Sequence, residues 1–318
     1  MASKKIRIGV SKCLLGEKVR FDGGHARNSF VMTELSRWFE LVPVCPEVEI
    51  GLGTPRPTIR LAIINDNQEL LMPSTGQILT EKMEAYASDK IRKLKTSGLD
   101  GFILKKNSPS CGKERLSIYR DGKKVSRQGV GIFAQALMDH WPSLPLEEDG
   151  RLNDAGLREH FIERVYGNFR WRKMVERGQT MGNLVEFHTR HKMLLLSHCV
   201  ESYRALGRIV ANKSNKRVEE VFETYEEGFH QCLSQRPSAK KHANVLEHTL
   251  GYFSQLLSPV EKTDLMESIR DFKSGLVPLV VPVSLFNFNI QRYQVPYLKG
   301  QLYFSPHPKE LALRNYCY

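Results

Sequence analysis

Three cysteines in the first half of the chain each follow a short apolar run. Cys13 comes after IRIGV, Cys45 after LVPV, and Cys111 after GFILKK. In an open parallel sheet the loops after the strands share one edge, and ligands bind at that edge. The loops contain proline, glycine or serine (SKC, CPE, SPSCG), which a cysteine that only fills a core does not need. The pattern predicts three thiols at one sheet edge, with the chemistry of a metal site.

This donor set leaves two kinds of metal centre open. Three sulfurs without an evident fourth ligand fit zinc with a free coordination position. They also fit an iron–sulfur cluster held by three cysteines with one iron free. The chain has no C-x-x-C pair, which disfavours a zinc ribbon and the usual ferredoxin arrangements. In both cases a substrate atom can bind at the free position, and a cluster iron favours a sulfur donor.

The other cysteines and a group of histidines carry weaker signals. The remaining cysteines lie in helical or tail segments without such loops, and we expect them to be structural: Cys199, Cys232 and Cys317. His188 and His191 form an i, i+3 pair, and His198 follows, but a convincing third metal ligand is lacking. We expect these histidines to form a surface or nucleic-acid-facing cluster.

The elements that must position the cysteines alternate along the first half. Residues 6–10 and 98–106 have the apolar content of strands, whereas residues 29–42, 80–94 and 129–142 have apolar residues at helical spacing. Residues 42–53 indicate a strand followed by a loop, because Pro46 and the glycines interrupt a helix. This alternation predicts an α/β domain that is Rossmann-like, with a mostly parallel sheet.

The second half has a different pattern. Prolines, an acidic cluster and a glycine in SLPLEEDGRLND predict a boundary, which divides the chain into domains 1–146 and 147–318. From residue 155 to about 273, apolar residues recur at three- and four-residue spacing, which predicts a mainly α-helical domain. The last 45 residues are rich in proline and aromatic residues and predict an irregular tail.

Charge and composition limit the class of protein. Of the 318 residues, 41% are hydrophobic, and no window approaches 18 uncharged apolar residues, so we expect no membrane span. The basic N-terminus lacks an apolar leader region, which favours the cytoplasm. The net charge is +12, and residues 161–217 hold 12 basic residues against 4 acidic ones. Such a concentration favours a nucleic-acid partner, and the alternative is a charged surface that only confers solubility.

Three segments resemble the TudS-type thiouracil desulfidases: GVSKCLLGEKVRFDGG, VPVCPEVEIGLGTPRPTIRL and LKKNSPSCG. The resemblance covers about residues 6–140 and includes all three cysteine motifs in order. It implies a [4Fe-4S] cluster on Cys13, Cys45 and Cys111, with one open iron that binds a thiocarbonyl sulfur. The second half, through HTRHKMLLLSH and PYLKGQLYFSPHPKEL, resembles the helical domain of the RudS tRNA 4-thiouridine desulfidases.

The implied reaction is hydrolytic and needs residues that activate water and orient the pyrimidine ring. Glu47, two residues after Cys45, is the candidate acid or base. Ser108 and Ser110, just before Cys111, are candidates for orienting substrate or water. Asp22 in FDGG is a further catalytic candidate, with a turn-forming role as its alternative.

Basic residues interleaved with aromatic ones in the second half are candidates for binding tRNA: Arg170, Trp171, Arg172, Lys173, Arg190 and Lys192. The cations would pair with phosphates, and Trp171 or Phe169 would stack on a base. The alternative is a solvated helix face with aromatic residues in the core. A stacked target nucleotide would have to turn out into the cluster site.

We therefore expect a desulfidase that converts 4-thiouridine in tRNA to uridine and releases sulfide. An alternative is desulfuration of free thiolated bases or nucleosides. A third possibility, from another class, is a cluster-bearing nucleic-acid-binding regulator without turnover. The sequence does not indicate an oligomeric state.

Overall fold

The computed structural model describes residues 5–212 and 214–318. The chain divides into two compact units, Met1–Asn153 and Asp154–Tyr318. The division lies a few residues after the expected boundary at 146/147, because Leu146–Glu148 form strand β9 beside β6. Across the described residues, no helix has both the length and the apolar content needed to cross a membrane. Residues 1–4, part of the segment in which no leader is expected, lie outside the described residues.

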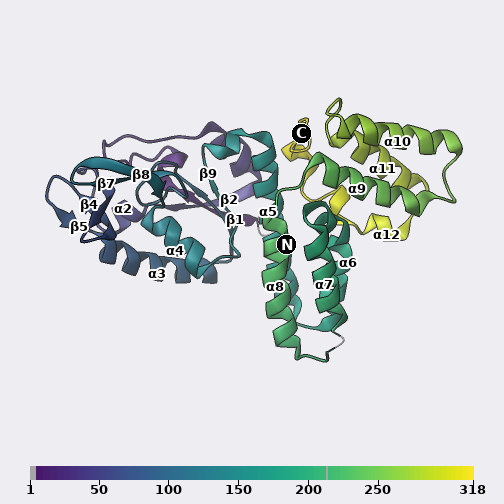
Figure 1. Cartoon of the computed structure of the whole chain (residues 1–318), viewed down its shortest axis with the longest axis horizontal. Coiled ribbons are helices and arrows are strands. Elements are labelled where there is room, and N and C mark those ends of the chain that lie inside the picture. The colour runs from purple at the N-terminus through teal and green to yellow at the C-terminus, as the bar shows by residue number, and fades with distance from the viewer. Residues whose placement is uncertain (1–4, 213) are drawn as a thin grey trace. The chain divides into compact units, whose positions relative to one another are not determined.

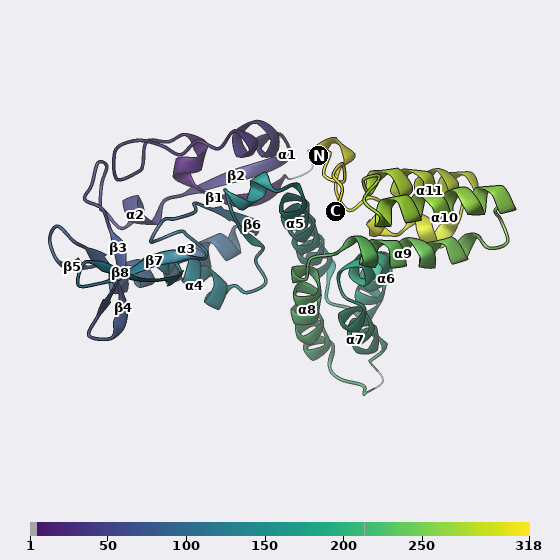
Figure 2. The ribbon, with the colours of Figure 1, turned by 45° about the horizontal axis from the view of Figure 1, so that its top comes forward.

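One sheet of the N-terminal unit is parallel, with the strand order β2-β1-β6-β9. Its strands are β1 (Ile6–Ser11), β2 (Phe39–Val44), β6 (Leu99–Leu104) and β9 (Leu146–Glu148). β1 and β6 are nearly continuous buried runs, as expected for inner strands of a parallel sheet. β1 lies beside β2 in Figure 2, so the loops that follow these two strands leave the sheet at the same edge.

Two helices pack against this sheet through apolar faces. They are α3 (Thr80–Thr96) and α4 (Ile132–His140), which lie side by side in Figure 1. Phe102 of β6 meets Phe133 of α4 edge-on, with ring centroids 5.8 Å apart. The prediction of an α/β domain with a mostly parallel sheet is therefore confirmed.

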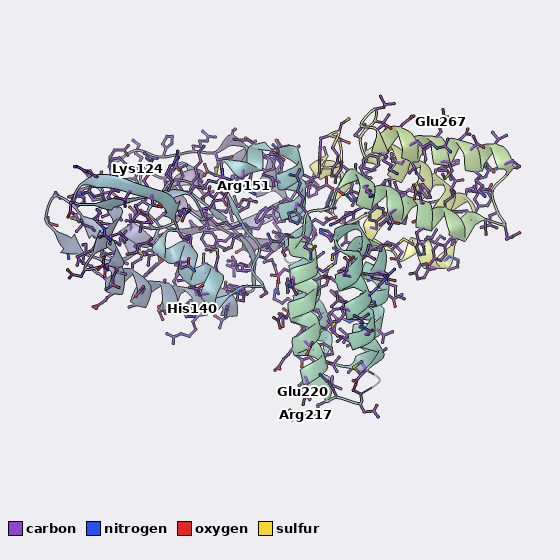
Figure 3. The ribbon with its side chains drawn as sticks, in the orientation of Figure 1. Lys124, His140, Arg151, Arg217, Glu220 and Glu267 are labelled. Atoms are coloured by element: carbon purple, nitrogen blue, oxygen red, sulfur yellow. The ribbon has the colours of Figure 1, made fainter. Side chains whose placement is uncertain are left out.

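A second sheet follows the order β5-β4-β3-β7-β8 and was not expected from the sequence. Its strands are β3 (Arg60–Ile64), β4 (Asn67–Met72), β5 (Gln77–Ile78), β7 (Leu116–Arg120) and β8 (Lys123–Gly129). All neighbouring pairs are antiparallel except β3 with β7. β8 is mostly exposed, and Lys124 of this strand is labelled in Figure 3.

The segment expected to be one helix over residues 29–42 is divided in the structure. A π-helical turn, Phe30–Leu35, leads into α1 (Ser36–Trp38), and β2 begins at Phe39. Pairing of β2 with β1 along its full length outweighs the helical spacing of the apolar residues. Directly after β2, Pro46 occupies the first turn of the short helix α2 (Pro46–Glu49), a position where proline needs no backbone donor.

The C-terminal unit is helical, which confirms the prediction for this half. Its helices are α5 (Ala155–Arg177), α6 (Met181–His198), α7 (Val200–Ala211), α8 (Val218–Ser234), α9 (Ala239–Leu250), α10 (Pro259–Lys273), α11 (Val280–Arg292) and α12 (Pro296–Lys299). Asp154 and Thr180 cap α5 and α6, and Ser258 forms a capping box with Glu261 at the start of α10.

The end of the chain is more regular than expected. Residues 280–292 form α11, which buries Val283, Phe286 and Ile290 on one face. The prediction of an irregular tail is wrong for this segment, because an apolar stripe at helical spacing outweighs its proline and aromatic content. Short 3-10 turns follow at Leu302–Phe304 and Lys309–Leu311.

Candidate active site

The three predicted cysteines line one cavity of about 410 Å³ at the edge of the parallel sheet. Cys13 lies in a 3-10 turn, Lys12–Leu15, directly after β1. Cys45 separates β2 from α2, and Cys111 lies in the loop after β6. Because β2, β1 and β6 are neighbours in the sheet, residues far apart in the sequence come to one place.

The protein environment favours the neutral form of these thiols. Burial, together with the nearby Cys45, raises the pKa of Cys13 to about 11. Burial also raises the pKa of Cys45, and raises that of Cys111 well above its usual value, although a hydrogen bond with Ser11 opposes the shift of Cys111. Thiolates in this cavity therefore need a cation to compensate their charge, which is what a bound metal centre supplies.

The cavity offers three thiol donors, which suit either a zinc ion with a free position or an iron–sulfur cluster. Over residues 5–212 and 214–318, no three His, Cys, Asp or Glu side chains are arranged to hold one metal ion. All three cavity cysteines are free of disulfide bonds.

Glu47 borders the same cavity, and its carboxylate accepts four hydrogen bonds from the side chains of an arginine and two serines. Arg56 donates to Oε2 from Nε at 3.1 Å and from Nη2 at 2.6 Å. Ser108 and Ser110 donate to Oε1 from their hydroxyls at 3.2 and 3.1 Å. Both predicted serines therefore contact the predicted acid or base, and Ser110, which is fully buried, positions Glu47 rather than facing the cavity.

Arg56 is the residue that sequence reasoning missed. Its Nη1 donates to the carbonyls of Val19 at 2.9 Å and Gly53 at 2.8 Å, while its other nitrogens bind Glu47. The side chain is 3% exposed, so this planar, permanently charged group joins two loops to the carboxylate from inside the protein. No local motif marks Arg56, because its contacts with Glu47 and Val19 depend on how the loop that carries it folds back.

The NSPSCG loop is held in place by the start of α4. The amides of Ile132 and Phe133 donate to the carbonyls of Pro109 at 3.2 Å and Ser110 at 3.0 Å. These bonds satisfy helix N-terminal donors that would otherwise lack partners. A Cβ at Gly131 would lie 2.5 Å from the backbone of Ser110, so only glycine permits this close approach.

The Cys45 turn has its own support. Glu49 accepts a hydrogen bond from the Cys45 amide at 3.0 Å, and its other oxygen accepts one from Lys90 of α3 at 2.7 Å. Burial alone would raise the pKa of Glu49, but these hydrogen bonds outweigh burial and lower it. The ionised Glu49 thus connects the turn at Cys45 to α3.

Asp22 is placed differently from the other catalytic candidates. It is exposed and is not among the residues that line the cavity. Its Oδ1 accepts a hydrogen bond from the Gly24 amide at 2.9 Å and faces Arg20 Nε at 3.4 Å. The structure therefore favours the turn-forming alternative for Asp22 over a catalytic role.

Comparison with known proteins agrees with this geometry. The family model described as 2-thiouracil desulfurase matches residues 8–149. Protein YbbK of Bacillus subtilis (strain 168) is 32% identical over 132 residues, which cover 39% of this chain and 85% of that protein. The chain belongs to the 2-thiouracil desulfurase family. Its N-terminal unit is accordingly a TudS-type desulfidase domain of the thiouracil class.

Other comparisons extend this result. A family model described as a protein of unknown function, DUF1722, matches residues 192–308, so the desulfurase domain is fused to a second domain. Protein YbgA of Escherichia coli (strain K12) is 29% identical over 153 residues, 48% of this chain and 90% of that protein. A solved structure described as a [4Fe-4S]-dependent thiouracil desulfidase, TudS, has 28% identity and a TM-score of 0.38, over 47% of this chain and 95% of that one.

Outside the desulfurase domain, the structure contradicts the role expected of Trp171. Its side chain is 3% exposed and lies in the core of the helical unit. The ring stacks on Tyr225 at 5.5 Å and meets Phe187 edge-on at 5.4 Å. Trp171 cannot stack on a base in this fold, because α5 turns it inward between its basic neighbours.

The basic neighbours of Trp171 have partners within the unit. Arg170 is largely buried, and it donates a hydrogen bond to the Pro306 carbonyl. Arg172 and Lys173 form ion pairs with Glu176 at 2.7 and 2.5 Å. Arg170 is therefore not available for a phosphate as expected, whereas the other two lie at the surface in local ion pairs.

The last two candidates in this group lie on α6 and differ in exposure. Arg190 is exposed, and Lys192 is half-buried in the wall of a surface cleft of about 640 Å³. Arg204 and Arg208 of α7 line the same cleft. These two arginines were not expected from the sequence. They come near Lys192 through the packing of α7 against α6, a tertiary contact that sequence spacing does not reveal.

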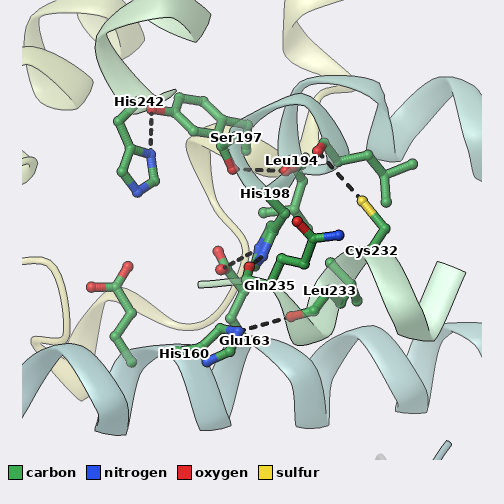
Figure 4. Close-up of polar contacts among 12 residues, drawn as sticks. His160, Glu163, Leu194, Ser197, His198, Cys232, Leu233, Gln235 and His242 are labelled. Atoms are coloured by element: carbon green, nitrogen blue, oxygen red, sulfur yellow. Dashed lines mark hydrogen bonds and ion pairs between the residues drawn. The ribbon is translucent and has the colours of Figure 1, made fainter. Parts of the chain in front are cut away.

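The histidines are buried rather than at the surface, which corrects the expectation of a surface cluster. His188, His191 and His198 are at most 3% exposed. His188 bonds the Tyr225 hydroxyl at 3.0 Å, and His191 bonds the Phe187 carbonyl at 2.7 Å. Figure 4 shows His198 beside Glu163, with Nε2 2.9 Å from Oε2. These histidines serve internal packing.

The remaining cysteines lie away from the cavity lining. Cys199 and Cys232 are buried in the helical core, in agreement with a structural role. Cys232 contacts the Leu195 carbonyl through its thiol at 3.6 Å. Cys317 is exposed, so the expectation of a structural role does not hold for it.

Proposed function

We propose that the protein is a [4Fe-4S]-dependent, non-redox desulfidase that converts 4-thiouridine in tRNA to uridine and releases sulfide. The observation that carries this proposal is the cavity in which Cys13, Cys45 and Cys111 meet Glu47. Family membership supports desulfuration of a thiolated pyrimidine. The cluster, the hydrolytic route and the tRNA substrate are our proposals.

The proposed reaction balances without an electron donor. The oxygen of one water replaces the sulfur on the ring carbon, and sulfur leaves with two hydrogens as hydrogen sulfide. When bound by the three cysteines, a [4Fe-4S] cluster supplies a Lewis-acidic iron with a free position suited to sulfur.

The protein's own residues supply the proton chemistry. Glu47 accepts a proton from the attacking water, because its carboxylate borders the cavity beside the cysteines. Arg56 and Ser110 hold that carboxylate in one orientation through the bonds described above. Ser108 lines the cavity as well as bonding Glu47, so its hydroxyl is the one placed to meet substrate or water.

The charge of the helical unit supports a polyanionic substrate. The cleft formed by Lys192, Arg204 and Arg208 presents three cations on adjacent helices. Such a cleft suits the phosphate backbone of RNA. The competing substrate, a free thiolated base or nucleoside, is supported by the fact that the cavity is built within the desulfurase domain alone.

Anaerobic reconstitution tests the cluster. We expect about four irons and four acid-labile sulfides per chain in the native protein, as the [4Fe-4S] composition requires. Single substitutions Cys13→Ala, Cys45→Ala and Cys111→Ala should each reduce that content severely. The matched control is Cys317→Ala, which removes an exposed thiol away from the cavity. Full iron content in all three cavity variants would reject the cluster assignment.

A salt titration of turnover separates the two substrates. Binding of tRNA through Lys192 and its neighbours should weaken steeply as salt rises, because bound phosphates release counterions. Turnover of a free thiolated base should change little over the same range. Equal salt dependence for both, with higher activity on the free base, would favour the smaller substrate.

A further inference from the structure

Exposed apolar side chains are concentrated in one part of the helical unit. Across residues 5–212 and 214–318, twelve large hydrophobic side chains are exposed, and seven of them lie between residues 252 and 288. Apolar side chains that are exposed singly are normal on a soluble protein, whereas a group of them marks an interaction site. The family model that matches this segment describes a protein of unknown function and assigns no role to the group.

The helix α11 is apolar on both of its faces. One face packs into the core of the unit through the buried side chains named above. On the other face Val281, Leu285 and Phe288 follow one another at spacings of four and three residues, which aligns them along the helix. We call these three residues the outer stripe. A helix that is apolar all round is normally buried on all sides, so the outer stripe lacks its cover.

The outer face of α11 carries no charge along its length. Its other exposed residues include Ser284 and Gln291, and the single charged residue of the helix is Arg292 at its end, which pairs with Glu261 at 2.7 Å. The neighbouring helix α10 exposes charged residues of both signs, among them Glu267, which is labelled in Figure 3. An uncharged apolar centre beside a polar rim is typical of a protein–protein interface.

The charge of the chain favours a second copy as the partner. With a net charge of +12, two copies repel each other wherever their charged surfaces meet. An uncharged face is where the copies can approach without placing like charges opposite each other. The same face offers no cation to the phosphates of RNA and no charged group that would select an acidic or a basic partner.

The order of the side chains in the outer stripe is complementary to itself. Leu285 stands between the smaller Val281 and the larger Phe288. When two copies of α11 pair in antiparallel directions about a twofold axis, Leu285 meets its own equivalent, and each Phe288 meets a Val281. Large side chains then face small ones, which is the arrangement that packs without gaps.

Apolar side chains are also exposed near both ends of the outer stripe. Leu276, which precedes α11, is 72% exposed, and Val260 at the start of α10 is 68% exposed. Val260 adjoins Glu261, which accepts hydrogen bonds from Arg292 and Tyr293 at the other end of α11. A stable dimer buries about 800 Å² on each partner, so side chains at both ends let the interface extend beyond one helix face.

We propose that two copies of this chain associate through the outer stripe of α11, as an antiparallel pair with Leu285 at the twofold axis. The stripe shares no residue with the cysteine cavity or with the cleft lined by Lys192, Arg204 and Arg208. A dimer of this kind therefore carries two copies of each. This inference is independent of the proposed function.

Light scattering of the full chain after size-exclusion chromatography, over a range of protein concentrations, tests the pairing. The native protein should reach the mass of two chains as concentration rises. Leu285→Lys places like charges opposite each other at the axis and should raise the dimer dissociation constant by about 30-fold or more, as expected for a central interface residue. Val125→Lys is the matched control, because Val125 is a 55% exposed residue of β8 outside the stripe. Added salt should not dissociate the dimer, because the stripe carries no charge.

A pair of opposite charges separates loss of pairing from loss of fold. Leu285→Lys and Leu285→Glu should each be monomeric alone, and an equimolar mixture should recover the mass of two chains. A native protein that stays monomeric at every concentration, a dimer that Leu285→Lys does not weaken, or variants that do not recover on mixing would overturn the proposal. Monomeric native protein that binds phosphatidylcholine vesicles, with binding lost in Leu285→Lys, would instead assign the stripe to a lipid surface.

Discussion

Arg56 and Glu47 form a buried two-point contact at the wall of the cysteine cavity. Two nitrogens of the guanidinium bind one carboxylate oxygen, at 3.1 and 2.6 Å. The second oxygen is left for Ser108 and Ser110, so it lies on the side of the NSPSCG loop. A carboxylate held by four hydrogen bonds keeps one orientation, which an acid–base group needs in order to act repeatedly on a positioned water.

Glu47→Gln tests the acid–base role. The amide keeps the size of the side chain but cannot take the proton, so we expect kcat to fall by about 10²–10⁴-fold. Iron and sulfide content should remain at the native level, because Glu47 is not a thiol ligand. Turnover within a few-fold of the native protein would contradict the role assigned to Glu47.

Arg56→Ala tests whether the ion pair also stabilises the domain. Removing one partner of a buried pair leaves the other charge uncompensated and should lower the free energy of unfolding by about 3–5 kcal/mol. Urea denaturation measures the change. Arg37→Ala is the control, because that side chain is 68% exposed and its pair with Glu34 should contribute little. Equal effects of the two substitutions would contradict the buried role of Arg56.

Substitutions distinguish the structural role of Trp171 from the tRNA-binding role proposed for the cleft lined by Lys192, Arg204 and Arg208. Trp171→Ala opens a cavity in the helical core and should lower the free energy of unfolding by about 3–5 kcal/mol. Trp171→Phe, which keeps most of the packing, should leave tRNA affinity unchanged. The double substitution of Lys192 and Arg208 to Ala should instead weaken tRNA binding and reduce its salt dependence. Loss of tRNA affinity in Trp171→Phe would restore a stacking role for Trp171.

The stability of the helical unit should depend on pH through Glu163. Burial alone would raise its pKa, but the hydrogen bond with His198 and the charge of Arg314 outweigh burial and hold it well below the usual 4.5. In the unfolded chain Glu163 takes up a proton near pH 4.5, while in the folded protein it stays ionised. Its contribution to stability is therefore present above that pH and is lost as the pH falls below it.

Urea denaturation at a series of pH values from 7 to 4 measures this contribution. Glu163→Gln should destabilise the protein by roughly 3 kcal/mol at pH 7, since it leaves His198 without its carboxylate and Arg314 with only that of Glu159. The difference from the native protein should narrow toward pH 4. Glu219→Gln, at an exposed position, is the control. A difference that stays constant with pH would contradict the ionised state of Glu163.

The meeting of the three cysteines at one edge of the sheet was predictable, because it depends on sequence patterns within a few residues of each cysteine. A strand that ends in a loop can be recognised locally, and parallel strands must bring such loops to one edge. The same reasoning placed Glu47, Ser108 and Ser110 near the cavity, since each lies within three residues of a cysteine. The contact of Glu47 with Arg56 was not predictable in this way, because it depends on how the loop after α2 folds back onto the cavity wall.

The features that the sequence did not predict were missed for a common physical reason, which is that tertiary contacts determine them. β8 carries the sequence KKVSRQG, which is polar and mostly exposed, so it lacks the alternation that marks a strand. Its strand conformation comes from pairing with β7, a tertiary contact. In the same way, FRWRKM could not reveal that Trp171 faces the core while its neighbours face outward, because the inner face of a helix is decided by what packs against it.

The most direct test of the account is the fate of 4-thiouridine in tRNA after anaerobic incubation with cluster-loaded protein. We predict that 4-thiouridine disappears, that uridine appears in equal amount, and that one sulfide is released for each conversion without added reductant. Cys111→Ala should give none of these changes. Intact 4-thiouridine after incubation with fully loaded native protein would contradict the proposed function.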